Sequence, residues 1–136
     1  MNTDMNTDMN TNMNRWEPIM NIKIFQYFGY KTHLTCDQIA NQMNLFIQGQ
    51  LSLHNSSYIG HYAKLIVKQG MIKILPHQDP FGDYRFPSHH HLDIIISVVI
   101  DQGKKRERLD LAQTWSQYLQ EQGFCLLEES QHTSPQ

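Results

Sequence analysis

Long apolar runs, a secretion signal and clustered cysteines are all missing from this chain. No apolar run approaches the roughly 18 residues that a membrane-spanning helix needs, and the N-terminus lacks the charged-then-apolar pattern of a signal peptide. Two cysteines, Cys36 and Cys125, stand far apart and form no metal-spaced or redox pair. We therefore expect a reduced cytoplasmic protein.

Glycine is also scarce, and the motifs of common enzymes are absent. The 136 residues include only seven Gly, and neither GxSxG nor GxxxxGK occurs. These motifs build the nucleophile turn of serine hydrolases and the phosphate loop of nucleotide-binding proteins. We expect a protein that is not an enzyme and needs no cofactor.

Charge is low overall and unevenly distributed. Charged residues make up 18% of the chain, and the formal net charge is −2. No Asp or Glu occurs between Asp37 and Asp79, however, and that stretch carries Lys64, Lys68 and Lys73. For binding to a polyanion, this local sign of charge matters more than the total.

Residues 1–14 repeat the tetrapeptide MNTD with decay, and they offer no apolar face beyond scattered Met. We expect this tail to be disordered. The ordered part should start near Trp16, with Pro18 in the first turn of a helix that ends around Gly29.

Two further helices and a hairpin are predicted next. Thr35 and Gln38 have the spacing of a capping box, which predicts a short helix over residues 34–43. Asn55 or Ser56 caps a third helix, predicted over residues 56–69 and ended by a glycine. Residues 71–75 and 84–86 read as two strands joined by a turn rich in Pro, Gly and Asp.

The remaining segment, residues 88–136, is read as a strand followed by a helix. Residues 92–100 contain six β-branched residues in nine, which favours a buried strand; a buried helix capped by Ser88 is the alternative. A basic cluster at residues 104–108 then opens a helix that ends at Gly123, and residues 124–127 form a short last strand.

The order of three helices and a hairpin is that of a winged helix-turn-helix. Two segments resemble this family of MarR-like and PadR-like regulators over residues 18–87. The first is the second predicted helix, with Leu34-Thr35, Ile39-Ala40 and Met43. The second is the third predicted helix and its exit, with Ser57, Ile59, Ile66, Gly70 and Met71-Ile72. The resemblance implies an α+β fold in which residues 15–87 form a winged helix domain and residues 88–136 complete the core or form a dimer interface.

A winged helix places its third helix in the major groove of duplex DNA and its flanking cations at phosphates. On this basis we expect double-stranded DNA as the partner and transcription regulation as the role. The expected contacts come from one helix face and from the wing: Ser57, Tyr58, His61, Lys64, Lys68, Lys73 and Arg85. A solvated helix face is the alternative for the lysines, and a protein-binding winged helix in a replication or assembly complex is the alternative function.

Other residues suggest weaker hypotheses. His89, His91 and Tyr118 loosely resemble the metal-binding histidines and the nucleophile of single-strand nucleases, which makes a metal-dependent nuclease the third hypothesis. No third metal ligand is evident, and no metal site is expected. Cys36 lies in the first turn of a predicted helix, where a thiolate would be favoured, although a lone thiol more often packs or lies idle.

The last predicted helix carries an apolar stripe formed by Leu111, Trp115 and Leu119. This stripe offers a surface for a homodimer, since regulators of this kind read two half-sites. It is equally suited to covering the strand at residues 92–100 within one molecule.

Overall fold

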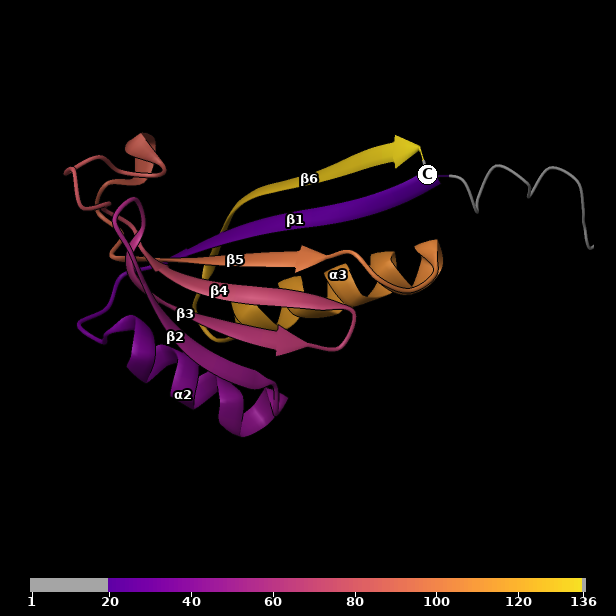
Figure 1. Ribbon diagram of the computed structural model, residues 1–136, viewed down its shortest axis with the longest axis horizontal. Coiled ribbons are helices and arrows are strands. Elements are labelled where there is room, and N and C mark those ends of the chain that lie inside the picture. The colour runs from indigo at the N-terminus through magenta and orange to yellow at the C-terminus, as the bar shows by residue number, and fades with distance from the viewer. Residues whose placement is uncertain (1–19, 136) are drawn as a thin grey trace, which may run out of the picture.

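The computed structural model describes residues 20–135 as a six-stranded antiparallel sheet with two α-helices on one side (Figure 1). The strands are β1 (Met20–Tyr30), β2 (Gln50–Ser56), β3 (Gly60–Val67), β4 (Gly70–Pro76), β5 (Ile94–Ile100) and β6 (Cys125–Pro135). The helices are α2 (Cys36–Ile47) and α3 (Lys105–Glu121), and a short 3-10 turn, η2, covers Pro87–His89. The repetitive tail, Trp16 and Pro18 lie outside the described residues.

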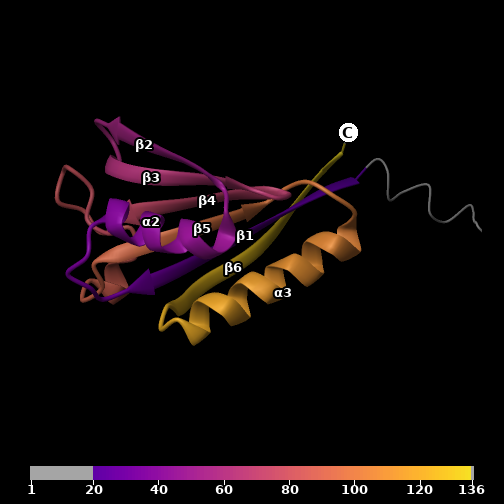
Figure 2. The same ribbon diagram turned by 90° about the horizontal axis from the view of Figure 1, so that it is seen from below.

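The strand order is β2-β3-β4-β5-β1-β6, so the first strand lies between the last two. The first three pairings of this order are hairpins or near neighbours, whereas β1 pairs with β5 and β6 from the far end of the chain. Figure 2 shows both helices in front of the strands, with β2 at one edge of the sheet and β6 at the other.

The winged helix-turn-helix prediction is wrong. Two of its three helices are strands: residues 20–30 form β1, and residues 56–69 form the end of β2, a turn and β3. The predicted wing also differs, because Tyr84 makes only an isolated bridge to Gln78 and residues 84–86 form no strand. The sequence resemblance to winged helix regulators therefore does not extend to the fold, and no recognition helix exists at residues 56–69.

A period of two residues explains why β1 is a strand. Ile22, Ile24 and Phe28 are buried against the helices, while Phe25 and Tyr27 between them point to the opposite face. β-branched and aromatic residues fill this segment, and they favour an extended chain with one buried face. Ile22, Phe25 and Phe28 also lie three residues apart, and this spacing is compatible with one face of a helix.

The apparent third helix is broken by its own turns. Ser56 does accept hydrogen bonds as a helix cap would, but its hydroxyl binds the backbone N–H groups of Tyr58 and Ile59 within a hairpin turn, both at 3.1 Å. Gly60 has φ +93°, a conformation that favours glycine and turns the chain back into β3. Gln69, with φ +66°, then reverses the chain from β3 to β4.

Local signals elsewhere were read correctly. Thr35 and Gln38 form the predicted capping box of α2, with hydrogen bonds of 3.2 and 2.9 Å. The strand predicted at residues 71–75 is confirmed as β4, and the strand reading of residues 92–100 is confirmed as β5. The last helix is confirmed as α3, and the short strand predicted after it is the long β6.

The core lies between the sheet and the two helices. α2 packs on β3 and β4, and α3 packs mainly on β1. The stripe of α3 takes part in this core: Leu119 is fully buried, and Leu111 and Trp115 pack against the buried cluster. Gln26 is buried among these apolar residues, and its side-chain amide donates to the Ala112 carbonyl and to Glu129, both at 2.8 Å, which ties α3 to β1 and β6.

A loop over residues 77–93 folds back at one end of the sheet, and buried His77 holds it in place. Its Nε2 accepts a hydrogen bond from the Phe86 backbone N–H at 3.1 Å, so the proton of the neutral ring is on Nδ1. Nδ1 donates this proton to the Leu92 carbonyl at 2.8 Å. His77 directly follows β4, so this one side chain joins the middle and the far end of the loop to the end of that strand.

Replacement of His77 tests this role. His77→Ala leaves the Phe86 N–H and the Leu92 carbonyl without their partner, and we expect a loss of about 3 kcal/mol in the free energy of unfolding. Urea denaturation measures this loss. The matched control is His91→Ala, an exposed histidine of the same loop, which should change stability by less than about 0.5 kcal/mol. Equal effects of the two substitutions would contradict the role of His77.

Candidate nucleic-acid interface

One face of the sheet carries no α-helix of the described residues 20–135, and we call it the uncovered face. It is formed by the side chains that alternate with the buried ones along each strand. Its residues are Lys23, Phe25 and Tyr27 of β1, Ser52 and His54 of β2, Tyr62, Lys64 and Ile66 of β3, Met71 and Lys73 of β4, Ser97 and Val99 of β5, and Glu128, Ser130 and His132 of β6.

Two lysines lie directly opposite each other at the middle of this face. Lys64 of β3 pairs with Lys73 of β4, and both side chains are partly exposed. Like charges in such a cross-strand pair repel each other and destabilise the sheet. The same arrangement concentrates positive charge where an anion can contact both ammonium groups.

Aromatic rings flank this lysine pair on the β2 and β3 side. Tyr62 stacks on the His54 imidazole, with ring centroids 5.1 Å apart and planes at 16°. Lys73 Nζ lies over the Tyr62 ring at 5.8 Å from its centroid, within the range of a cation–π interaction. Tyr62 is thus part of a half-exposed aromatic and cationic cluster.

A second aromatic group lies on β1, toward the other edge. Tyr27 packs on Phe86 of the loop with ring centroids at 5.6 Å, and Phe25 meets His132 edge-on at 4.9 Å. The loop therefore forms a wall at one end of the uncovered face. Sequence reasoning missed Phe25, Tyr27 and His54; the alternation in residues 22–28 was the available signal.

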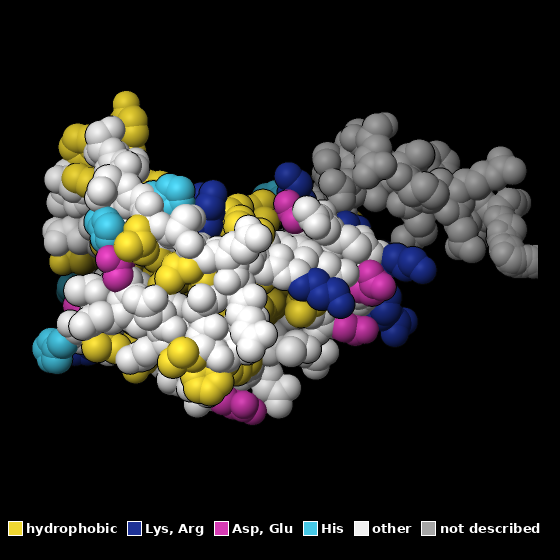
Figure 3. Space-filling view, turned by 60° about the horizontal axis from the view of Figure 1, so that its bottom comes forward, with side chains coloured by type: hydrophobic (Ala, Val, Ile, Leu, Met, Phe, Trp, Pro, Cys, Tyr) yellow, Lys and Arg dark blue, Asp and Glu magenta, His cyan; other side chains and the backbone are white. Residues whose placement is uncertain are grey.

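Acidic residues are nearly excluded from the uncovered face. Among its strand residues, Glu128 alone is a carboxylate, whereas Glu129 next to it points to the covered face and binds Gln26. Figure 3 shows Lys and Arg mixed with Asp and Glu at the end of the molecule where α3 begins. There, the Lys104 N–H at the N-cap of α3 binds the Glu107 carboxylate at 2.9 Å, and this hydrogen bond lowers the pKa of Glu107.

The structure separates the residues predicted to contact DNA. Lys64 and Lys73 lie together on the uncovered face, but Lys68 lies in the β3–β4 turn at one end of the sheet. Ser57 and Tyr58 lie in the β2–β3 turn at the other end. Tyr58 is 75% exposed, and its ring is 6.4 Å from that of Phe81 in the loop.

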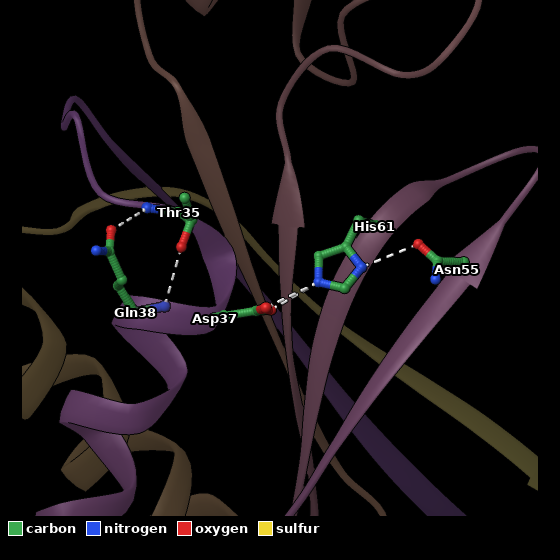
Figure 4. Close-up of polar contacts among 5 residues, drawn as sticks. All are labelled: Thr35, Asp37, Gln38, Asn55 and His61. Atoms are coloured by element: carbon green, nitrogen blue, oxygen red, sulfur yellow. Dashed lines mark hydrogen bonds and ion pairs between the residues drawn. The ribbon is translucent and has the colours of Figure 1, made fainter.

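His61 lies on the opposite face of the sheet, beside the start of α2 (Figure 4). Its Nε2 contacts both carboxylate oxygens of Asp37, at 2.8 and 3.0 Å, and its Nδ1 contacts the Asn55 side-chain oxygen at 2.9 Å. Asp37 is in the first turn of α2, where the helix dipole favours a negative charge. This contact joins α2 to the hairpin and does not belong to the uncovered face.

Arg85 holds the loop rather than extending a wing. Its Nε donates to the Pro76 carbonyl at 2.9 Å, and its Nη2 donates to the Ile59 carbonyl at 3.1 Å. These contacts join the loop to β4 and to the β2–β3 turn.

The nuclease hypothesis finds no support in the geometry. The rings of His89 and His91 are 6.1 Å apart, and no three His, Cys, Asp or Glu side chains of the described residues 20–135 form a group that could hold a metal ion. Tyr118 packs beside Trp115 on α3, which covers the other face of the sheet.

A groove of about 700 Å³ lies between α3 and strands β1 and β6. Its lining contains Glu121, Glu129 and several glutamines, with no Lys or Arg. This composition does not suit a polyanion, in contrast to the uncovered face.

No protein-family model matches this chain, and no curated protein sequence matches it. No helix within residues 20–135 is both long and apolar enough to cross a membrane.

Cys36 does not have the properties of a reactive thiol. It is the first residue of α2 but is only 6% exposed, and burial, aided by the Asp37 charge, raises the pKa of its thiol to about 11. Burial therefore outweighs the effect of the helix start, which would favour the thiolate. Cys125 is exposed, and both cysteines are free.

Thiol labelling tests this assignment. At pH 8 we expect one fast-reacting cysteine in the folded protein, namely Cys125, and a second only after denaturation, because Cys36 is buried and protonated. A colorimetric disulfide reagent measures both phases. Cys125→Ser should abolish the fast phase, and Cys36→Ala should leave it unchanged. A fast phase that persists in Cys125→Ser would contradict the protected state of Cys36.

Proposed function

We propose that this protein binds single-stranded nucleic acid across the uncovered face of its sheet. The observation that carries the proposal is the opposed pair Lys64 and Lys73 beside the Tyr62 ring, on a face with a single carboxylate. Proteins that bind single strands combine cations that follow the phosphates with aromatic rings on which bases stack. Both components are present in two adjacent cross-strand pairs of this face: Lys64 with Lys73, and Tyr62 with His54.

The width of the face favours a single strand over a duplex. Six strands spaced about 4.8 Å apart make a surface roughly 24 Å across, which is wider than the major groove at about 12 Å. Bases of a single strand, in contrast, are free to turn toward a sheet and stack on its aromatic residues. The two aromatic groups lie on either side of the lysine pair, so a strand that crosses the sheet would meet both.

The repulsion between Lys64 and Lys73 supports a role for the pair in binding an anion. Without an anion, the pair costs stability, since each ammonium group raises the local potential felt by the other. A bound phosphate removes this cost and adds a favourable contact. We place this activity in the cytoplasm, where free cysteines such as Cys36 and Cys125 stay reduced.

The first test removes the two charges. We expect Lys64→Gln with Lys73→Gln to weaken binding of a fluorescent single strand roughly tenfold at moderate salt, because two phosphate contacts are lost. Fluorescence anisotropy over a salt series measures the affinity, and the slope of log affinity against log salt should become shallower by about 1.4. Lys105→Gln, an exposed lysine of α3, is the matched control and should retain near-native affinity.

Two results would contradict the proposal. One is the absence of any complex with single-stranded DNA or RNA at low salt. The other is a native protein that binds duplex DNA as tightly as a single strand of the same sequence, since the argument from the width of the face then fails.

The second test concerns base stacking. Tyr62→Leu keeps an apolar side chain but removes the ring. We expect it to weaken binding of a strand that carries all its bases by about tenfold, which corresponds to the loss of one stacked base. Tyr62→Phe keeps the ring and should bind almost as the native protein does. On an abasic strand, which has phosphates but no bases, Tyr62→Leu should bind as the native protein does. An equal loss on both strands would exclude stacking at Tyr62.

A further inference from the structure

The two edges of the sheet differ in how they are protected against pairing with another strand. β6 carries adjacent carboxylates, Glu128 and Glu129, and its pairing with β1 is interrupted by a bulge at Tyr27/Phe28. Charged residues and bulges are the usual features that prevent an edge strand from pairing with a strand of another molecule. The β6 edge is therefore protected against such pairing.

β2 has none of these protections. Its seven residues, QLSLHNS, include no Lys, Arg, Asp, Glu or Pro, and its register with β3 runs without a shift from Gln50 to Ser56. Among the described strands β2 pairs only with β3, so its outer backbone N–H and C=O groups lack a strand partner. At its middle, Leu53 is 52% exposed on the face that α2 only partly covers.

We propose that β2 pairs with β2 of a second copy of this chain, antiparallel and about a two-fold axis at Leu53. An antiparallel pair of identical strands is self-complementary, so one surface supplies both halves of the interface. This register pairs all seven residues: Leu53 meets Leu53 of the partner subunit, and each Ser52 lies opposite the other copy's His54. Each exposed Leu53 is then covered by its mate.

Charge favours a second copy over a charged partner. The only formally charged residue in α2 and β2 is Asp37, and it is already paired with His61. Two copies therefore meet at this edge without like charges. The pairing also joins the two uncovered faces into one surface, with the lysine pairs on either side of the axis. The dimer does not depend on the proposed function, because it forms through the edge and not through the face.

The oligomeric state of the full chain, measured without nucleic acid, tests the proposal. Sedimentation velocity over a range of concentrations should give a dimer for the native protein and a monomer for Leu53→Lys, which puts a like charge on each side of the axis. Gln131→Lys, on the β6 edge, is the matched control and should remain a dimer. Thermal unfolding of each variant by circular dichroism verifies that it folds.

Cross-linking tests the register. In a Cys125→Ser background, Leu53→Cys should form a disulfide-linked dimer under mild oxidation, because directly opposed residues of an antiparallel pair have Cα atoms about 4.5–5.5 Å apart. Gln131→Cys in the same background should remain monomeric on a denaturing gel. A native protein that is monomeric at every concentration would overturn the proposal, as would cross-linking at Gln131 but not at Leu53. Neither result bears on nucleic-acid binding by one copy.

Discussion

The whole architecture depends on the insertion of β1 between β5 and β6. β1 pairs with seven residues of β5 and with ten of β6, and both partners come from the far end of the described chain. The connection from β5 to β6 must therefore cross over β1, and α3 is that crossing. Such long-range pairing imposes a large loop-closure entropy, so the central strands should form late in folding relative to the β2–β3–β4 meander.

Because both described α-helices lie on the same side, the opposite side of the sheet carries the loop of residues 77–93 and no described α-helix. Gln26 contributes to this asymmetry, since its amide fixes α3 at the crossing point between β1 and β6. Leu75 and Ile95, which pair with each other on this side of the sheet, are buried, whereas the lysines and aromatic rings of the uncovered face are partly exposed. The candidate interface thus follows from the placement of α3 and of one loop.

Sequence alone predicted the elements whose signals are local. A capping box identified α2, a dense run of β-branched residues identified β5, and an apolar stripe ending at a glycine identified α3. β1 and β3 were wrongly predicted to be helices. Their apolar residues are so closely spaced that they fit both the period of a helix and the two-residue period of a strand. What decides between the periods is the partner strand, which for β1 lies beyond residue 93 and is not visible in the local pattern.

The candidate site was predicted in part for the same reason. Lys64 was selected from a helix face and Lys73 from a wing, and both structural reasons were wrong. The carboxylate-free stretch that supported them is an argument from charge, which does not depend on secondary structure. The grouping of Lys64 with His61 and Lys68 did depend on it, since a helix brings together residues three or four apart while a strand brings together residues two apart. The alternation in residues 22–28 indicates that Tyr27 and Phe25 share a face, but only the pairing across the sheet places that face on the same side as the lysines.

The alternation along each strand has a consequence for how this protein can change. Every second residue of β1, β3 and β4 belongs to the core, and those between belong to the uncovered face. Substitutions at Tyr62, Lys64 or Lys73 alter the uncovered face while Ala63, Leu65 and Ile72 continue to pack the interior. The chemistry of the uncovered face and the packing of the core are therefore encoded by interleaved but separate sets of positions, which makes the uncovered face a favourable target for directed evolution.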